Sequence, residues 1–246
     1  TVQIFIIFLF ILSFYPILYG ANPAQYQDTI NQGVFKKTVK SVKLHRDGWV
    51  ISYPIIELYG ESHLKLSFDD LSNEVKNYQY KIIHCDSEWI PSPISETEYL
   101  DGYLQNQIYD YNFSFNTYHS YIHYTLKLPN DDVNFKISGN YAIIVYQNYD
   151  ESDVVFIKRF QVTEKIVNVK AQVQRPVLSI YRNTGQQVNF TVNYASLNVE
   201  DPYNNLKVVI LQNGRWDNRI KNLKPLFDKN KILEYDYQME TVFPGG

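Results

Sequence analysis

Residues 84–146 read HCDSEWIPSPISETEYLDGYLQNQIYDYNFSFNTYHSYIHYTLKLPNDDVNFKISGNYAIIVY. Polar and apolar side chains alternate through residues 119–128, and Ser138-Gly139-Asn140 predicts a tight turn before the apolar run 141–146. A period of two, bounded by turns, predicts antiparallel β-strands with one buried face. The same stretch holds the single cysteine of the chain and many tyrosines, so it bears on chemistry as well as on fold.

Outward from this stretch, short runs rich in Val, Ile and Tyr recur along the whole chain. Turn-forming Asn, Asp, Gly and Pro bound each run. Asp47-Gly48 predicts a hairpin with residues 49–53 as its second strand, because Gly accepts positive φ. Further strands are predicted at 34–44, 64–68, 78–84, 107–115, 119–128, 141–146, 154–162, 166–174, 188–194, 206–212 and 232–237.

Many short strands with almost no helical periodicity predict an all-β protein. We expect two tandem β-sandwich domains, immunoglobulin- or fibronectin-like, after an N-terminal signal peptide. The predicted parts are the signal peptide 1–21, a linker 22–33, an N-terminal sandwich 34–164 and a second sandwich 165–246, which is expected to be incomplete at its C-terminus. The signal peptide is predicted because the apolar run is short, is interrupted by Pro16 and ends in Gly20-Ala21; a retained N-terminal anchor is the alternative.

Charge and cysteine usage exclude several classes. Lys and Arg number 23 against 26 Asp and Glu, without a basic run, so a nucleic-acid interface is not expected. One cysteine cannot form an internal disulfide, and the core must therefore rest on apolar and aromatic packing, with Tyr 22 and Phe 14 available. Neither a GxGxxG nor a P-loop pattern is present, so no nucleotide or small-molecule substrate is expected.

Reactive residue types cluster at His84, Cys85, Asp86 and Glu88. Alternation in a strand places neighbours on opposite faces, whereas a structural zinc site needs four converging ligands. An adjacent Cys-His pair also lacks the spatial pairing that a thiolate nucleophile requires. We therefore expect packed or hydrogen-bonded side chains here, with no metal and no cofactor.

A second set of carboxylates, Glu96, Glu98 and Asp101, could in principle supply an acid-base pair for glycoside chemistry. A solvated acidic loop explains the same residues without a perturbed pKa. We therefore predict no catalytic residues and a non-enzymatic protein.

The aromatic residues support an interaction role instead. Exposed Tyr and Trp anchor interfaces, whereas alternate ones fill cores. The predicted partner-contact surface consists of Tyr99, Tyr103, Tyr109, Tyr111 and Tyr118. The predicted structural core includes Trp89, Cys85, Tyr141 and Trp216. A carbohydrate-binding or surface-glycan module that stacks exposed aromatics on sugars is the alternative.

A series of short blocks in fixed order resembles one known family, the type IX secretion system plug proteins of Bacteroidota. The similarity extends from about Val34 to the end of the chain. The blocks include Pro54-Ile55-Ile56, Leu66 to Leu71, His84-Cys85-Asp86 with Trp89, Glu98 to Gly102, Leu128-Pro129-Asn130, Ser138 to Tyr141, Arg159-Phe160, Gln212 to Asp217 and Phe243 to Gly246.

This resemblance implies a periplasmic β-rich protein at the inner face of the outer membrane. It would bind the periplasmic opening of the type IX outer-membrane translocon barrel, seal its pore and associate with the membrane through that partner. The resemblance implies no catalytic residues and no cofactor.

Overall fold

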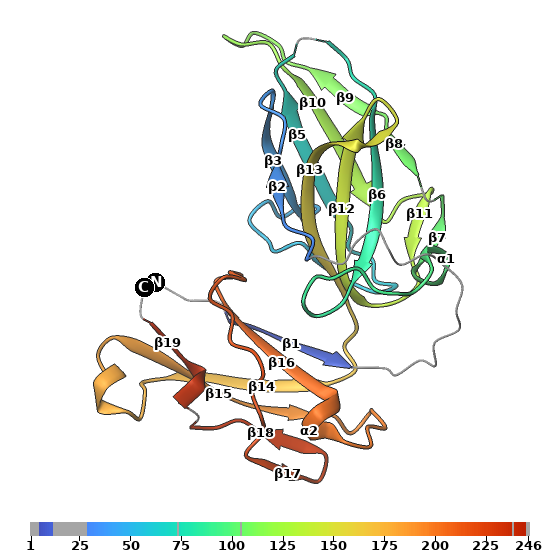
Figure 1. Cartoon of the computed structure of the whole chain (residues 1–246). Helices are drawn as coiled ribbons and strands as arrows, with labels where there is room; N and C mark the ends of the chain where they lie inside the picture. The colour runs from blue at the N-terminus through green and yellow to red at the C-terminus, as the bar shows by residue number, and fades with distance from the viewer. Residues whose placement is uncertain (1–4, 12–28, 73, 104, 238, 245–246) are drawn as a thin grey trace. The chain divides into compact units, whose positions relative to one another are not determined.

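The computed structural model of the chain describes residues 5–11, 29–72, 74–103, 105–237 and 239–244. The chain divides into two units: Tyr19–Glu164, here the first unit, and Lys165–Gly246 with Thr1–Leu18, here the second unit. Both consist mainly of antiparallel sheets, so the protein is all-β and sandwich-like (Figure 1). The helices α1 (Glu96–Tyr99) and α2 (Pro202–Asn205) are single turns. Among the described residues, none of the helices has the length and apolarity to span a bilayer.

Two sheets enclose the core of the first unit. The first has the order β3-β5-β10-β9, formed by β3 (Val39–Arg46), β5 (Leu64–Asp70), β10 (Ile122–Leu128) and β9 (Asp110–Phe113). The second has the order β2-β13-β12-β6-β8, formed by β2 (Gly33–Val34), β13 (Asp150–Thr163), β12 (Gly139–Gln147), β6 (Tyr78–Cys85) and β8 (Asn106–Ile108). In addition, β4 (Ile55–Glu57) pairs with β13, and β7 (Leu100–Gly102) pairs with β11 (Val133–Phe135).

Phe68 of β5 is the point where side chains of both sheets meet. Its ring centroid lies 5.0 Å from those of Tyr78, Tyr124 and Phe156, with the Tyr124 ring stacked and the other two edge-on. Such offset and edge-to-face contacts contribute beyond the area they bury. Alternation along each strand therefore directs aromatic side chains of both sheets into one core cluster.

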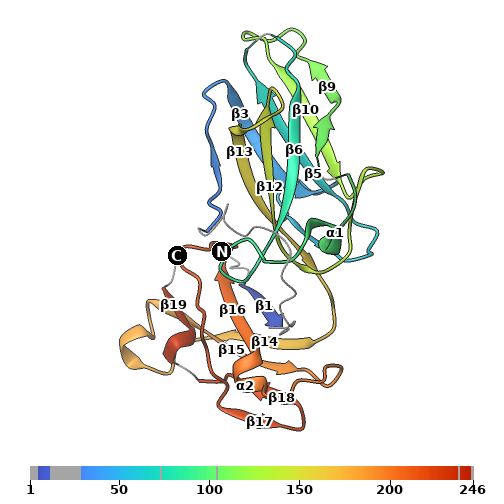
Figure 2. The same cartoon turned by 45° about the vertical axis from the view of Figure 1, so that its right-hand side comes forward.

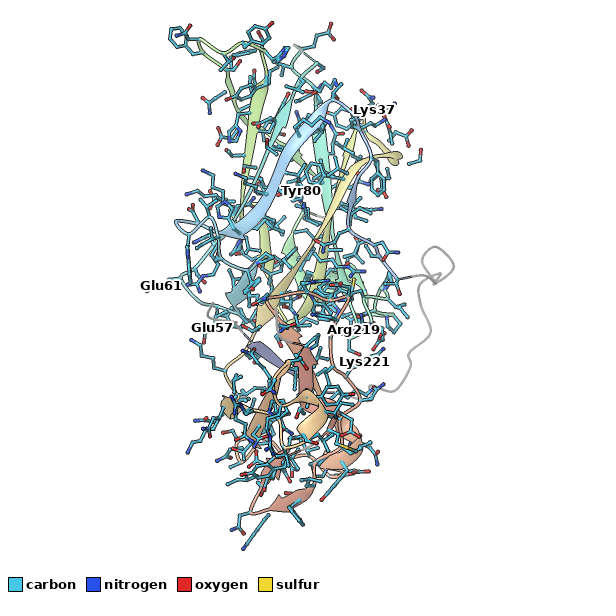
Figure 3. All side chains as sticks on the ribbon, turned by 90° about the vertical axis from the view of Figure 1, so that its left-hand side faces the viewer. Lys37, Glu57, Glu61, Tyr80, Arg219 and Lys221 are labelled. Carbon is cyan, nitrogen blue, oxygen red and sulfur yellow. The ribbon has the colours of Figure 1, made fainter. Side chains whose placement is uncertain are left out.

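Tyrosine can fill this core because the buried hydroxyl groups find acceptors or donors at its rim. The Tyr78 hydroxyl donates to the buried Asp70 carboxylate at 2.8 Å. The hydroxyls of Tyr99 and Tyr141 donate to the backbone carbonyls of Ile82 and Ile137. In Figure 3 the label of Tyr80 falls among the strands of the first unit and that of Lys37 at its periphery.

The second unit contains a sheet of order β14-β15-β18-β17, with β19 also pairing with β15. Its strands are β14 (Asn168–Gln174), β15 (Gly185–Asn193), β18 (Ile232–Glu234), β17 (Phe227–Lys229) and β19 (Val242–Pro244). The 3-10 turns η1 and η2 cover Ser179–Tyr181 and Met239–Thr241. A separate antiparallel pair joins β16 (Leu206–Gln212) to β1 (Phe5–Ile11).

The structure modifies two sequence predictions. The hairpin expected at Asp47-Gly48 is wrong, since β3 pairs with β5 and Trp49 forms only an isolated bridge with Arg46. Residues 50–52 form a turn whose Ile51 is 85% exposed, so this stretch has no buried face to hold it as a strand. The predicted signal peptide and linker lie largely outside the described residues, and the described part of the signal peptide is β1.

The Asp70–Tyr78 hydrogen bond yields a stability prediction. Burial raises the pKa of Asp70, but hydrogen bonds from Tyr78, Ser72 and Lys76 outweigh burial and hold that pKa below its ordinary value. Replacing Tyr78→Phe should lower the free energy of unfolding of the first unit by about 1.5–3 kcal/mol at pH 7, because a hydrogen bond to a buried charge is lost. Chemical denaturation followed by circular dichroism measures this difference.

The pH dependence provides the control. The pKa of Asp70 is lower in the folded than in the unfolded chain, so its contribution is complete above about pH 3.9 and is lost as pH falls through the folded value. The difference between wild type and Tyr78→Phe should therefore shrink in acid. The exposed Tyr118→Phe should be neutral at every pH. A pH-independent difference would contradict the assigned role of the carboxylate.

Candidate partner-contact surface

The reactive cluster consists of the last two residues of β6, His84 and Cys85, and the turn that follows, in which Asp86 is exposed. Cys85 is 2% exposed, and burial raises the pKa of its thiol to about 12. Burial also lowers the pKa of His84, whose Nδ1 lies 2.7 Å from the Ser92 Oγ. Asp86 accepts the backbone N–H groups of Glu88 and Ile90. Within the described ranges, no group of three or more His, Cys, Asp or Glu side chains is placed to hold a metal ion.

Close packing fixes His84 in this turn. A Cβ atom on Gly139 would lie 2.2 Å from the His84 Nε2, and the φ of Gly139 is +157°, so a side chain is excluded there. The His84 ring also packs edge-on against Tyr141 at 5.0 Å. The end of β6 therefore holds the His84 imidazole and the Cys85 thiol as packed groups.

Trp89 follows the same strand end and holds the segment at Ile30 against the first unit. Its side chain is 3% exposed, and the guanidinium carbon of Arg159 lies 4.6 Å from its ring centroid. Arg159 Nε donates to the Ile30 carbonyl at 2.7 Å, and the Ile30 N–H donates to the Trp89 carbonyl at 2.9 Å. Trp89 and Cys85 are thus buried, although neither belongs to the main core cluster, whereas Tyr141 does.

Trp216 differs from the prediction that placed it in the core. Its side chain is only partly buried and lies outside the core cluster of the second unit. Asn213 and Gly214 both have positive φ and turn the chain directly after β16. Trp216 therefore lies beyond the strand end, where the alternation that would aim it at the core has stopped.

The acidic stretch is also ordered. Glu98 accepts the backbone N–H of Ser95 at 2.7 Å and completes a capping box at the start of α1. A capping box stabilises the first turn of a helix, so the Glu98 carboxylate has a structural role here.

The five tyrosines of the predicted contact surface separate into three groups. Tyr99 is 3% exposed and its hydroxyl is bound to the Ile82 carbonyl, so its inclusion in the contact surface is wrong. The reason is that α1 turns Tyr99 inward against β6 rather than leaving it in an open loop. Tyr103 is 70% exposed on the connection from β7, beside Asp132. Tyr109, Tyr111 and Tyr118 are exposed around β9.

The exposed aromatic residues at β9 define the candidate surface, called here the β9 aromatic surface. Its members are Tyr109, Tyr111, Phe113, Phe115 and Tyr118. All four residues of β9 are exposed, and Phe115 and Tyr118 in the following loop are 93% and 96% exposed. Sequence reasoning missed Phe113 and Phe115. Their signal was phenylalanine on both sides of Ser114, immediately before the turn-prone Asn116-Thr117.

Backbone hydrogen bonds hold the β9 aromatic surface in place. The loop is closed by the Ser114 N–H donating to the Tyr121 carbonyl and the Tyr121 N–H donating to the Ser114 Oγ, each at 2.9 Å. Tyr111 packs against Phe113 and Tyr124, with centroids 5.8 and 5.7 Å apart. Figures 1 and 2 show β9 as the last strand of its sheet.

Such a surface is suited to a protein interface. Rigid aromatic side chains bury large areas at low entropic cost, and contiguous exposed apolar patches mark contact sites. The edge of β9 that faces away from β10 adds backbone donors and acceptors that a partner strand can use. The fold and surface define a β-sandwich protein that presents aromatic side chains at a sheet edge.

The chain belongs to the type 9 secretion system plug protein family, since the family model for the first domain of the plug protein matches residues 39–164. The family ties the chain to type IX secretion. Every residue of the core cluster of the first unit lies within the matched range.

The chain is also similar to a crystal structure of a hypothetical protein from Parabacteroides merdae ATCC 43184, determined at 2.30 Å resolution. The sequences are 35% identical, the match covers 89% of this chain and 55% of that chain, and the TM-score is 0.85. The chain thus spans about half the length of that protein. No curated protein is similar enough to count as a match.

The burial of Cys85 yields a prediction about reactivity. Because its pKa is about 12 and its side chain is 2% exposed, alkylation by iodoacetamide at pH 8 should be at least about a hundredfold slower than in the denatured chain. Mass spectrometry of timed aliquots measures both rates. Rapid alkylation of the folded protein would show that the Cys85 thiolate is accessible, and would contradict its assignment as a packed side chain.

Proposed function

We propose that the chain is a non-enzymatic periplasmic plug that binds the periplasmic opening of the type IX outer-membrane translocon and seals its pore. The observation that carries this proposal is the family match over residues 39–164, which comprises the core-forming strands β3 to β13 of the first unit. Membrane association arises through the partner barrel. The leader expected in the sequence supports export to the periplasm.

The β9 aromatic surface supports docking through the first unit. A wide barrel opening presents polar side chains and backbone edges, and a plug needs rigid groups that bury area and still accept hydrogen bonds. On this hydrogen-bonded loop, tyrosine and phenylalanine rings supply area to bury, and the tyrosine hydroxyls supply the hydrogen bonds. Because the net charge is only -3, the protein is not strongly repelled by either a positively or a negatively charged partner surface.

The proposal predicts a site-specific loss of binding. The double variant Phe115→Ala/Tyr118→Ala removes two almost fully exposed rings without opening the core. Capture of the translocon barrel from native envelope extracts by the tagged protein should fall at least about tenfold, since aromatic anchors dominate interface energies. Quantitative mass spectrometry of captured proteins measures the change.

A matched control comes from the same unit. Val50→Ala/Ile51→Ala removes exposed apolar side chains from a different loop and should leave capture unchanged. In cells, deletion of the gene should admit large hydrophilic solutes across the outer membrane. Unchanged permeability together with no captured barrel would refute the plug, and a glycan-array signal lost in the Phe115/Tyr118 variant would favour the carbohydrate-binding alternative.

A further inference from the structure

Strand β16 of the second unit is buried on both faces from Val208 to Gln212, and only Lys207 near its start is exposed. Leu206, Val208 and Ile210 belong to the core cluster and are at most 2% exposed. Val209 and Leu211, which alternate with them, are 5% and 2% exposed. A strand that is covered on both faces lies inside the fold, so an unpaired edge there would leave backbone N–H and C=O groups without partners.

The two edges of β16 are paired very differently. On one edge, Ile210 forms the one bridge found among the described residues, since its N–H and C=O bond to Ile220 at 2.9 and 3.0 Å. On the other edge β1 pairs with all seven residues, from Phe5 opposite Gln212 to Ile11 opposite Leu206 (Figures 1 and 2). Since alternate residues of a strand direct their backbone groups to opposite edges, the N–H and C=O of Val209 and Leu211 face β1.

The strand that occupies this edge lies inside the predicted signal peptide 1–21. Cleavage would remove β1 and leave β16 with the single bridge to Ile220. An interior apolar strand with a bare edge carries unpaired backbone groups and pairs readily with other chains. The folded second unit therefore requires a strand at this edge after the leader has gone.

We propose that the β1-facing edge of β16 is a strand-acceptor site. In the mature protein it receives an antiparallel apolar strand of about seven residues from another part of the same polypeptide. The Parabacteroides merdae chain supports this source, since a large share of that polypeptide lies outside the match. A strand tethered in the same chain also has a high effective concentration, which favours it over a second molecule. This inference does not depend on the plug function.

Hydrogen exchange of the β16 amides tests the site. A protease site inserted within residues 22–28 allows the leader to be cut from the folded chain and washed away. Exchange in residues 206–212 should then accelerate at least about tenfold, while residues 39–164 keep their protection. The probe is a peptide FIIFLFI flanked by lysines, which should restore protection, whereas the same peptide with Ile7→Asp and Leu9→Asp should not.

The mature full-length protein from the native host should be protected without any peptide.

Three results would overturn the proposal. The first is full protection of residues 206–212 in a cleaved chain that is monomeric by light scattering. The second is fast exchange of these residues in the mature full-length protein. The third is protection of the cleaved chain only as a dimer, which would identify a second copy as the occupant.

Discussion

The hydrogen bond from the Tyr78 hydroxyl to the buried Asp70 carboxylate connects the two sheets of the first unit. Asp70 ends β5 in one sheet and Tyr78 begins β6 in the other, so the bond closes one end of the core. The carboxylate is tolerated there because Ser72 and Lys76 also donate to it. The aromatic cluster around Phe68 packs directly beneath this network, and its geometry depends on Tyr78 being held in place.

This constraint separates the tyrosines of the first unit into two populations. Buried ones such as Tyr78, Tyr99 and Tyr141 have a hydroxyl partner at the core rim, which removes the cost of burying a polar group. Those around β9, Tyr109, Tyr111 and Tyr118, have exposed side chains at the sheet edge. A core that is already closed by its own side chains leaves β9 available for another molecule.

Sequence alternation was sufficient to predict the strands and the fold class, because it reports directly which face of each strand is buried. It placed β6, β10, β12, β15 and β16 close to their observed bounds. Predictions from alternation were wrong at positions where the chain changes direction. Tyr99 follows a capping box that turns it inward, Trp216 follows two residues of positive φ, and residues 49–53 pair with nothing beyond one bridge. These outcomes depend on local turn geometry, which alternation does not encode.

The two units differ in where the strands that complete their sheets come from. This difference determines which unit can fold without the N-terminal strand β1. In the first unit, the whole core cluster and every strand of the two sheets except β2 (Gly33–Val34) come from residues 39–164, the range that the family model matches. In the second unit, β16 supplies core residues, yet seven of its backbone pairings come from β1. Loss of that strand would leave the paired edge of β16 without its partner. The stability of the second unit is therefore coupled to which strand occupies β16, while the β9 aromatic surface rests on a fold that closes itself.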